Sequence, residues 1–244
     1  MCESCYYRYI HECLQKLVQS NIVYMESVMA RKTKQETLET HTALLDAAER
    51  VFFEKGVSAT TLADVASAAG MTRGAIYWHF KDKSELLSAV FDRVMSPMQT
   101  LLGELVGSTG DDPLAALRQL TVHTLTQLAH NPRQQVVFNI LFHRSEKTGE
   151  LAGLFANEMN QRDECLPMVE GVLKQAVAKK QLAPDTDTWL AMQTLHAFIT
   201  GIMHEWLLEP GSYDLAQRAG EMVDVFIAGL KAKPPLKRPH PSRT

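Results

Sequence analysis

Two short helices that cross at a tight turn are predicted by residues 61–80, which read TLADVASAAGMTRGAIYWHF. Counted from Leu62, Ala66 is the fifth residue, Gly70 the ninth and Ile76 the fifteenth. The small Ala66 lets two helices approach closely, and Gly70 can adopt a positive φ at the turn without steric cost. Ile76 can then pack back onto the first helix. This spacing is typical of a helix-turn-helix, whose second helix lies in the major groove of DNA.

The second helix of the pair carries side chains that suit a nucleic acid. Thr72 and Arg73 lie at its start, where such a helix meets the edges of the bases. Its end carries rings at four successive positions, from Tyr77 to Phe80. Because each residue turns an α-helix by about 100°, these rings cannot all point into the core. We expect Phe80 to be buried and at least one of its ring-bearing neighbours to be exposed.

The rest of the chain also has a helical pattern, which predicts an all-α protein. Apolar residues recur at spacings of three and four, and no alternating segment indicates a strand. Pro97 predicts a bend, and Pro167 a kink or a break. The expected helices are 38–55, one that starts at Thr61, 72–79, one from Asp82 to about 107, 113–130, 133–144, 149–180, 185–208 and 213–231.

Composition divides the chain into four parts. We assign 1–28 to a non-native or disordered extension, 29–84 to a three-helix DNA-binding domain, 85–230 to a larger helical domain and 231–244 to a basic, disordered tail. Residues 84–230 hold 10 basic and 18 acidic residues, whereas residues 231–244 hold five basic residues and no acidic one. This acidic body with separate basic sites predicts local contact with a polyanion.

The first 28 residues are interpreted as translated upstream sequence before a natural start at Met29; the alternative is an amphipathic helix from Tyr9 to Val23. They hold three of the four cysteines, and a structural zinc site needs four ligands that a compact fold holds in place. We therefore expect no metal and no cofactor. A secretory signal and a membrane span are also not expected, so the cytoplasm is the predicted location. The residues considered as metal ligands, and not expected to bind one, are Cys2, Cys5, His11 and Cys13.

Several stretches resemble the TetR family of transcriptional regulators, and within it the AcrR-like repressors of multidrug efflux pumps. The segments are MARKTKQET (29–37), MTRGAIYWHFKDKSELL (71–87), DDPLAALRQL (111–120) and the pair GIMHEWLLEP and YDL (201–215). The resemblance covers residues 29–230. It departs where the subgroup often has a cysteine and this chain has Ser145, so thiol-based sensing at that position is not carried over.

The resemblance implies an all-helical homodimer that binds a palindromic double-stranded operator through its N-terminal domain. A basic arm near the minor groove and residues of the helix-turn-helix would contact DNA. Ligand binding in the larger domain would move the fourth helix and change the spacing of the two reading heads. The implied DNA contacts are Arg31, Lys32, Lys34, Thr61, Thr72, Arg73, Gly74, Tyr77, Trp78, His79 and Lys83.

The larger domain is rich in methionine and aromatic residues, which suit a pocket that accepts many shapes. The acidic body is compatible with cationic ligands. The candidate ligand-binding residues are Phe138, Asn139, Phe142, Met159, Met168, Met192, Gln193, His196 and Trp206. The last two helices would pair with those of a second subunit as a four-helix bundle. The candidate dimer residues are Leu195, Ile199, Ile202, Val223, Phe226 and Leu230.

The predicted function is a repressor of a multidrug efflux operon that small hydrophobic or cationic drug-like ligands release from DNA. The alternative is a regulator of a metabolic operon with one narrow ligand. An enzyme is not expected. The chain has no Gly-rich phosphate loop, and neither His11-Glu12 nor His204-Glu205 has the second histidine of a zinc-protease motif.

Overall fold

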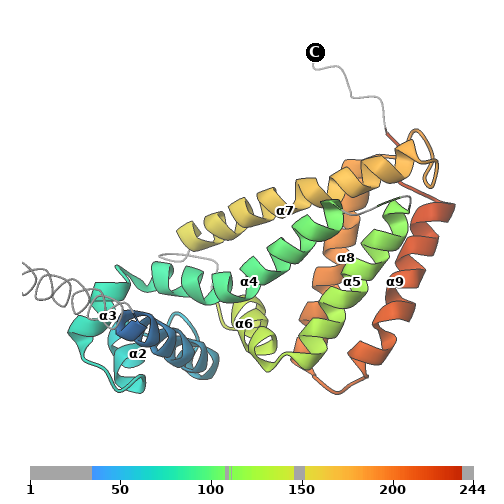
Figure 1. Cartoon of the computed structure of the whole chain (residues 1–244). Coiled ribbons are helices and arrows are strands. Elements are labelled where there is room, and N and C mark those ends of the chain that lie inside the picture. Colours follow the sequence, from blue (N-terminus) through green and yellow to red (C-terminus); the bar gives the residue numbers. More distant parts are fainter. Residues whose placement is uncertain (1–34, 108–109, 111, 146–151, 238–244) are drawn as a thin grey trace, which may run out of the picture. The chain divides into compact units, whose positions relative to one another are not determined.

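The computed structural model describes residues 35–107, 110, 112–145 and 152–237, and these residues form helices joined by turns. None of them lies in a β-strand, which confirms the all-α prediction (Figure 1). The first described segment, 35–55, is helical throughout. The described helices are all too short or too polar to cross a membrane.

The helix-turn-helix prediction is confirmed in its backbone. Helix α2 spans Leu62–Ala68 and α3 spans Arg73–His79, and the two helices pack on each other. Their shared core contains Val65, Ala66 and Ile76, which are buried. Ala66 therefore has the predicted role of a small residue where two helices cross.

The larger domain consists of α4 (Lys83–Gly107), α5 (Pro113–His130), α6 (Pro132–His143), α7 (Ala152–Ala178), α8 (Thr188–Leu208) and α9 (Leu215–Ala232). Helix α5 packs along α9, and α7 packs against α4 and α8 (Figure 1). Four of these helices, α5, α6, α8 and α9, begin after an Asp or Asn whose side chain accepts a hydrogen bond from a first-turn amide. Such a cap stabilises a helix by about 1 kcal/mol.

Two prolines lie inside helices that continue through them. Pro97 is in α4 and Pro167 is in α7, which runs from Ala152 to Ala178 without a break. Of the two predicted outcomes at Pro167, a kink or a break, the break is wrong and the kink stays a prediction. A proline removes one backbone hydrogen bond, and the packing of α7 on α4 and α8 supports the helix on either side.

The first residues of the predicted disordered tail are ordered in the structure. Lys231 and Ala232 still belong to α9. Leu236 then forms an antiparallel bridge with Thr186, and the amide of Asp187 donates to the carbonyl of Pro235 over 2.7 Å. Residues 238–244 and the predicted extension 1–28 lie outside the described residues.

Candidate functional site

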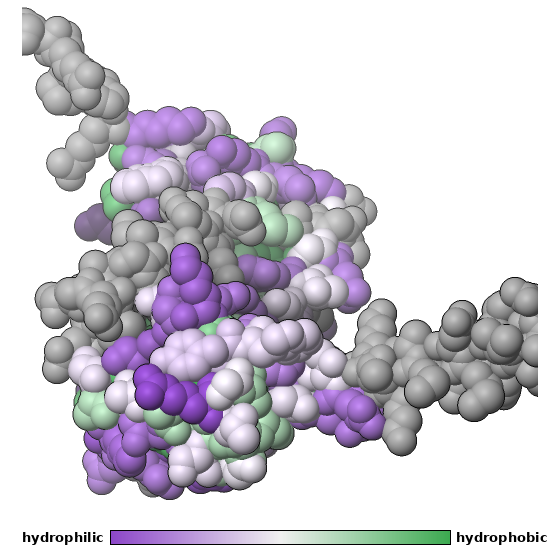
Figure 2. Space-filling model, turned by 90° about the vertical axis from the view of Figure 1, so that its left-hand side faces the viewer, coloured by the Kyte–Doolittle hydropathy of each residue, from purple (hydrophilic) through white to green (hydrophobic). Residues whose placement is uncertain are grey.

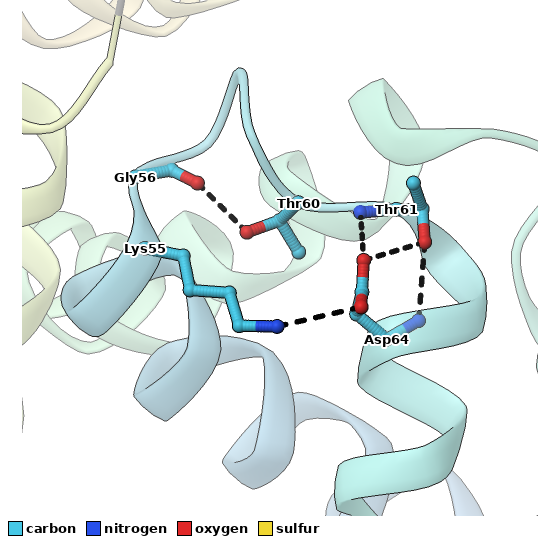
Figure 3. Close-up of polar contacts among 5 residues, drawn as sticks. All are labelled: Lys55, Gly56, Thr60, Thr61 and Asp64. Atoms are coloured by element: carbon cyan, nitrogen blue, oxygen red, sulfur yellow. Dashed lines mark hydrogen bonds and ion pairs between the residues drawn. The ribbon is translucent and has the colours of Figure 1, made fainter.

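The start of α2 is held by a closed set of hydrogen bonds around Asp64 (Figure 3). The Thr61 amide donates to Oδ2 of Asp64 over 2.9 Å, and the Asp64 amide donates to the Thr61 hydroxyl oxygen over 3.2 Å. The Thr61 hydroxyl donates to the same carboxylate over 2.6 Å. These bonds, with the nearby ammonium of Lys55, lower the pKa of Asp64 to about 2. The reciprocal bonds between Thr61 and Asp64 form a capping box at the start of α2.

The turn between the two helices depends on glycine. Gly70 has a φ of +69°, and no atom lies within 4 Å of the position that a Cβ would occupy. The backbone conformation, not a lack of space, is what favours glycine here. The amide of Met71 then donates back to the carbonyl of Ala66 over 2.9 Å, which closes the turn. The orientation of α3 relative to α2 is therefore fixed by the backbone.

Helix α3 has a buried side and a side exposed to solvent. Ile76 and Phe80 are buried, as predicted. Tyr77 and Trp78 are 48% and 72% exposed. The guanidinium of Arg73 lies over the Tyr77 ring, 5.7 Å from its centre, and the Trp78 and His79 rings meet edge to face. An exposed surface with a cation, two large rings and a hydroxyl can contact bases, sugars and phosphates.

The structure brings most of the predicted DNA contacts to this surface. Thr72, Arg73 and Gly74 are exposed beside the two rings, and the Thr72 hydroxyl accepts a hydrogen bond from the Ala75 amide. His79 and Lys83 are half-buried, and the Lys83 ammonium donates to the Ser58 carbonyl over 3.3 Å. The predicted arm residues Arg31, Lys32 and Lys34 lie outside the described residues. Figure 2 shows a mainly hydrophilic surface with hydrophobic colour in small patches.

A buried carboxylate links three helices. Glu49, whose side chain is 10% exposed, accepts a hydrogen bond from Arg93 of α4 over 2.8 Å and from Nε of Arg133 of α6 over 3.0 Å. Arg50, the next residue, donates to the carbonyl of Ala68 at the end of α2 over 2.9 Å. The sequence pattern did not predict this cluster. Its signal is an acidic residue beside the apolar stripe of the first helix, one turn after Leu45.

A cavity of about 490 Å³ lies among α4, α5, α6, α7 and α8. This volume is in the range of pockets that hold small molecules. Most of its described lining is apolar, and both arginines of the Glu49 cluster line it. The other polar lining residues are Gln99, Thr121, His123, Thr124, Gln127, Asn131 and Gln134, with Cys165 on α7.

The predicted ligand-binding residues lie in other places. Phe138 is buried and stacks on Phe142, with 5.9 Å between ring centres. Asn139 donates to the Leu207 carbonyl over 3.4 Å, and its buried Oδ1 has no hydrogen-bond partner among the described residues. The indole of Trp206 donates to the Tyr213 carbonyl over 3.2 Å. These side chains hold α6, α8 and the chain after α8 together, and none of them is in the described lining of the cavity.

The remaining candidates are also absent from the described cavity lining. Met192 is buried, and Gln193 and His196 are half-buried on α8. Met168 lies near α4, with its methyl carbon 3.8 Å from the position that a Cβ on Gly103 would occupy. The side chain of Met159 lies outside the described residues. Of the predicted aromatic and methionine set, Phe138, Met192 and Trp206 are buried, and the role of the set in ligand binding stays a prediction.

Among the described residues, no group of three or more His, Cys, Asp or Glu side chains could hold a metal ion. The N-terminal residues considered as metal ligands lie outside the described residues; they are Cys2, Cys5, His11 and Cys13. The described chemistry is thus an exposed helix with cationic and aromatic side chains, and a cavity lined by apolar groups and two arginines.

Comparison with known proteins agrees with this geometry. The family model described as bacterial regulatory proteins, tetR family, matches residues 44–90, and that of the MAATS-type transcriptional repressor, C-terminal region, matches residues 112–232. The HTH-type transcriptional regulator AcrR of Shigella flexneri is 38% identical over 211 residues, which cover 86% of this chain and 98% of that protein.

Two solved structures have the same fold. One is NalD, described as the secondary repressor of the MexAB-OprM multidrug efflux pump in Pseudomonas aeruginosa, with a TM-score of 0.73, 31% identity and coverage of 80% of this chain and 97% of that one. The other is the complex of SmeT from Stenotrophomonas maltophilia with triclosan, with a TM-score of 0.70, 32% identity and coverage of 84% and 100%. These relatives are transcriptional regulators and not enzymes. The chain belongs to the TetR family of bacterial transcriptional regulators.

Proposed function

We propose that this protein is a repressor that binds a palindromic operator as a homodimer and controls an operon for a multidrug efflux pump. Small hydrophobic drug-like molecules would bind in the cavity and release it from DNA in the cytoplasm. The observation that carries the proposal is the exposed face of α3, where Arg73, Tyr77 and Trp78 lie on a helix whose turn and caps are fixed. The printed descriptions of NalD and SmeT as efflux repressors support the choice of target.

Binding to DNA would use the predicted contacts as a set. Arg73, Tyr77 and Trp78 would meet the major groove, and Thr72 and Lys83 would approach phosphates at its edge. The single O–H of Thr61 already donates to Asp64, so Thr61 would contact a phosphate only after its hydroxyl turned away from that carboxylate. Arg31, Lys32 and Lys34 are proposed as an arm near the minor groove.

Dimerisation would use α8 and α9, but not through four of the six residues predicted from periodicity; the other two, Ile199 and Phe226, are half-buried and stay candidates. Leu195, Ile202, Val223 and Leu230 are buried within the single chain, so they cannot form the contact between subunits. The exposed side of α8 carries the small residues Thr194, Ala197 and Gly201, and α9 exposes Val225. Small side chains let helices of two subunits approach closely, so this surface is the better candidate.

The structure changes the prediction of the ligand's charge. Cationic ligands were expected because residues 84–230 are acidic overall. The charged side chains described in the cavity lining are Arg93 and Arg133, which repel a cation. Most of the negative charge therefore belongs to the solvated surface, and the apolar lining supports the hydrophobic part of the expectation.

The test is fluorescence anisotropy with the labelled DNA upstream of the gene, at two salt concentrations. We expect sequence-specific binding whose affinity falls with salt, because phosphate contacts release counterions. Trp78→Ala should weaken binding by about tenfold or more, since interface tryptophans often contribute 2 kcal/mol or more. The matched control is Trp189→Ala, which removes an indole that is also exposed but lies on α8.

The release of DNA is tested by adding structurally different efflux substrates to the same complex. Release by several of them supports a multidrug repressor. The absence of specific, salt-sensitive binding would contradict the proposed function.

A further inference from the structure

We infer that the cavity binds an amphipathic organic anion, with its charged head between Arg93 and Arg133 and its apolar body among α4, α5, α7 and α8. This inference rests on the proposed function and names the class of ligand. The predicted ligand is a hydrophobic carboxylate or a molecule of the same charge distribution. It replaces the cationic ligands expected from composition.

The charged end of the cavity carries the inference. Arg93 and Arg133 both line the cavity and both donate to the carboxylate of Glu49, over 2.8 and 3.0 Å. Glu49 itself is not in the described lining. In the contacts described, these two guanidiniums share one carboxylate. A ligand thus meets the cationic side of the cluster, and a carboxylate there forms short charge-assisted hydrogen bonds.

The apolar part of the lining suits an alkyl or aryl body. Its described lining includes Met98 and Leu102 of α4, Leu117 of α5, Val169 of α7 and Leu195 and Ile199 of α8. Leu102, Leu117 and Leu195 are buried, so a ligand that touches them is removed from water. Methionine side chains adapt to different shapes. A lining that combines apolar side chains with two guanidiniums is what an amphipathic anion complements.

The head group of such a ligand would compete with Glu49 for the two arginines. Arg133 has a side chain that is 46% exposed, against 20% for Arg93, so it has more room to turn towards a ligand. When the arginines bind the ligand, the ion pairs from Glu49 to α4 and α6 weaken. Arg50, beside Glu49, donates to the end of α2. Competition between the ligand and Glu49 for the two arginines would thereby affect the helix-turn-helix through Arg50.

The test is calorimetric titration of the full-length protein, without DNA, with three probes of one chain length: decanoate, decanol and decyltrimethylammonium. Each is used below its critical micelle concentration at neutral pH, where the carboxylate is ionised. We expect decanoate to bind at least about tenfold more tightly than the other two, as charge-assisted hydrogen bonds contribute at this level. Equal or tighter binding of decanol or of the cation would overturn the inference, as would no binding of decanoate.

Variants separate the head-group site from a general change in the fold. Arg133→Gln and Arg93→Gln should each weaken decanoate binding by about tenfold and change decanol binding by less than about twofold. Glu49→Gln removes the competitor and should tighten decanoate binding several-fold, the direction opposite to that of a damaged fold. Unchanged decanoate affinity in both arginine variants would refute the placement of the head group.

A matched control is Arg118→Gln, which also removes an ion-paired arginine, on the side of α5 that faces Asp224. Arg118 is not in the described lining, so decanoate affinity should stay within about twofold. A loss in this variant equal to that in Arg133→Gln would show a nonspecific charge effect and would overturn the inference. Operator binding is measured separately, so a failure of the proposed function is distinguished from a failure of the anion site.

Discussion

The guanidinium of Arg73 lies 5.7 Å from the centre of the Tyr77 ring, one turn further along α3. A cation over an aromatic face is attracted by the ring, by about 0.5–1 kcal/mol at an exposed site. The contact restricts the rotamers of Arg73 while both groups remain open to solvent. The side chain is thereby partly ordered for DNA before binding, which reduces the entropy lost in the complex.

Arg73 and Lys83 should differ in the kind of DNA contact that they make. Arg73→Gln is expected to lower operator affinity by about 1–3 kcal/mol and to relax specificity at one base pair. Lys83→Gln should weaken binding to all sequences alike and reduce the salt slope by about one. Anisotropy titrations on operator and scrambled DNA at several salt concentrations distinguish the two. A uniform loss for Arg73→Gln would mean that it contacts phosphate only.

The positive φ of Gly70 predicts opposite effects of one substitution at two glycines. Gly70→Ala should lower the free energy of unfolding by about 1–2 kcal/mol, because an L-residue is strained at this φ. Gly171→Ala, within α7, should raise it by roughly 0.5–1 kcal/mol. Neither glycine has an atom within 4 Å of a new Cβ, so steric contact does not confuse the comparison. Urea unfolding measures both, and equal effects would contradict the role given to φ.

Local signals in the sequence predicted the helix-turn-helix well. The hydrogen bonds of Thr61 and Asp64 and the turn at Gly70 involve only residues a few positions away in the chain. Their roles therefore follow from sequence spacing and from simple backbone chemistry. The same holds for Asn131 before Pro132, which caps α6 by accepting from the amides of Arg133 and Gln134. Such caps set the helix boundaries close to those expected.

Long-range contacts were not predictable in the same way. The bonds from Glu49 to Arg93 and Arg133 join residues 44 and 84 positions apart, and no local pattern encodes them. Periodicity also does not distinguish a helix face that lines a cavity from one that is packed in the core. Periodicity therefore selected Phe138 and Met192, which are buried outside the described lining of the cavity, and did not select Arg93 and Gln127, which line it.

The lowered pKa of Asp64 predicts a pH effect on stability. The folded pKa of about 2 lies below the unfolded value of about 3.9, so the contribution is complete above pH 4. It is lost as the pH falls from about 4 through about 2. Melting temperatures between pH 5 and 2 should fall less steeply for Asp64→Asn than for the parent. Asp46→Asn, an exposed carboxylate on the first helix, is the matched control and should follow the parent.

The small residues exposed on α8 give a test of the proposed dimer. Apart from the adjoining backbone of α8, no atom of the described residues lies within 4 Å of a Cβ added to Gly201, so we expect Gly201→Arg to leave the fold of the single subunit intact. In a dimer that uses this surface, the arginine would separate two closely packed helices. We expect sedimentation velocity to show monomers. Operator affinity should fall by at least about a hundredfold, because the two reading heads no longer bind as a linked pair. Gln175→Arg adds the same charge to an exposed position of α7 and should remain dimeric. A dimeric Gly201→Arg protein would place the subunit contact on another surface.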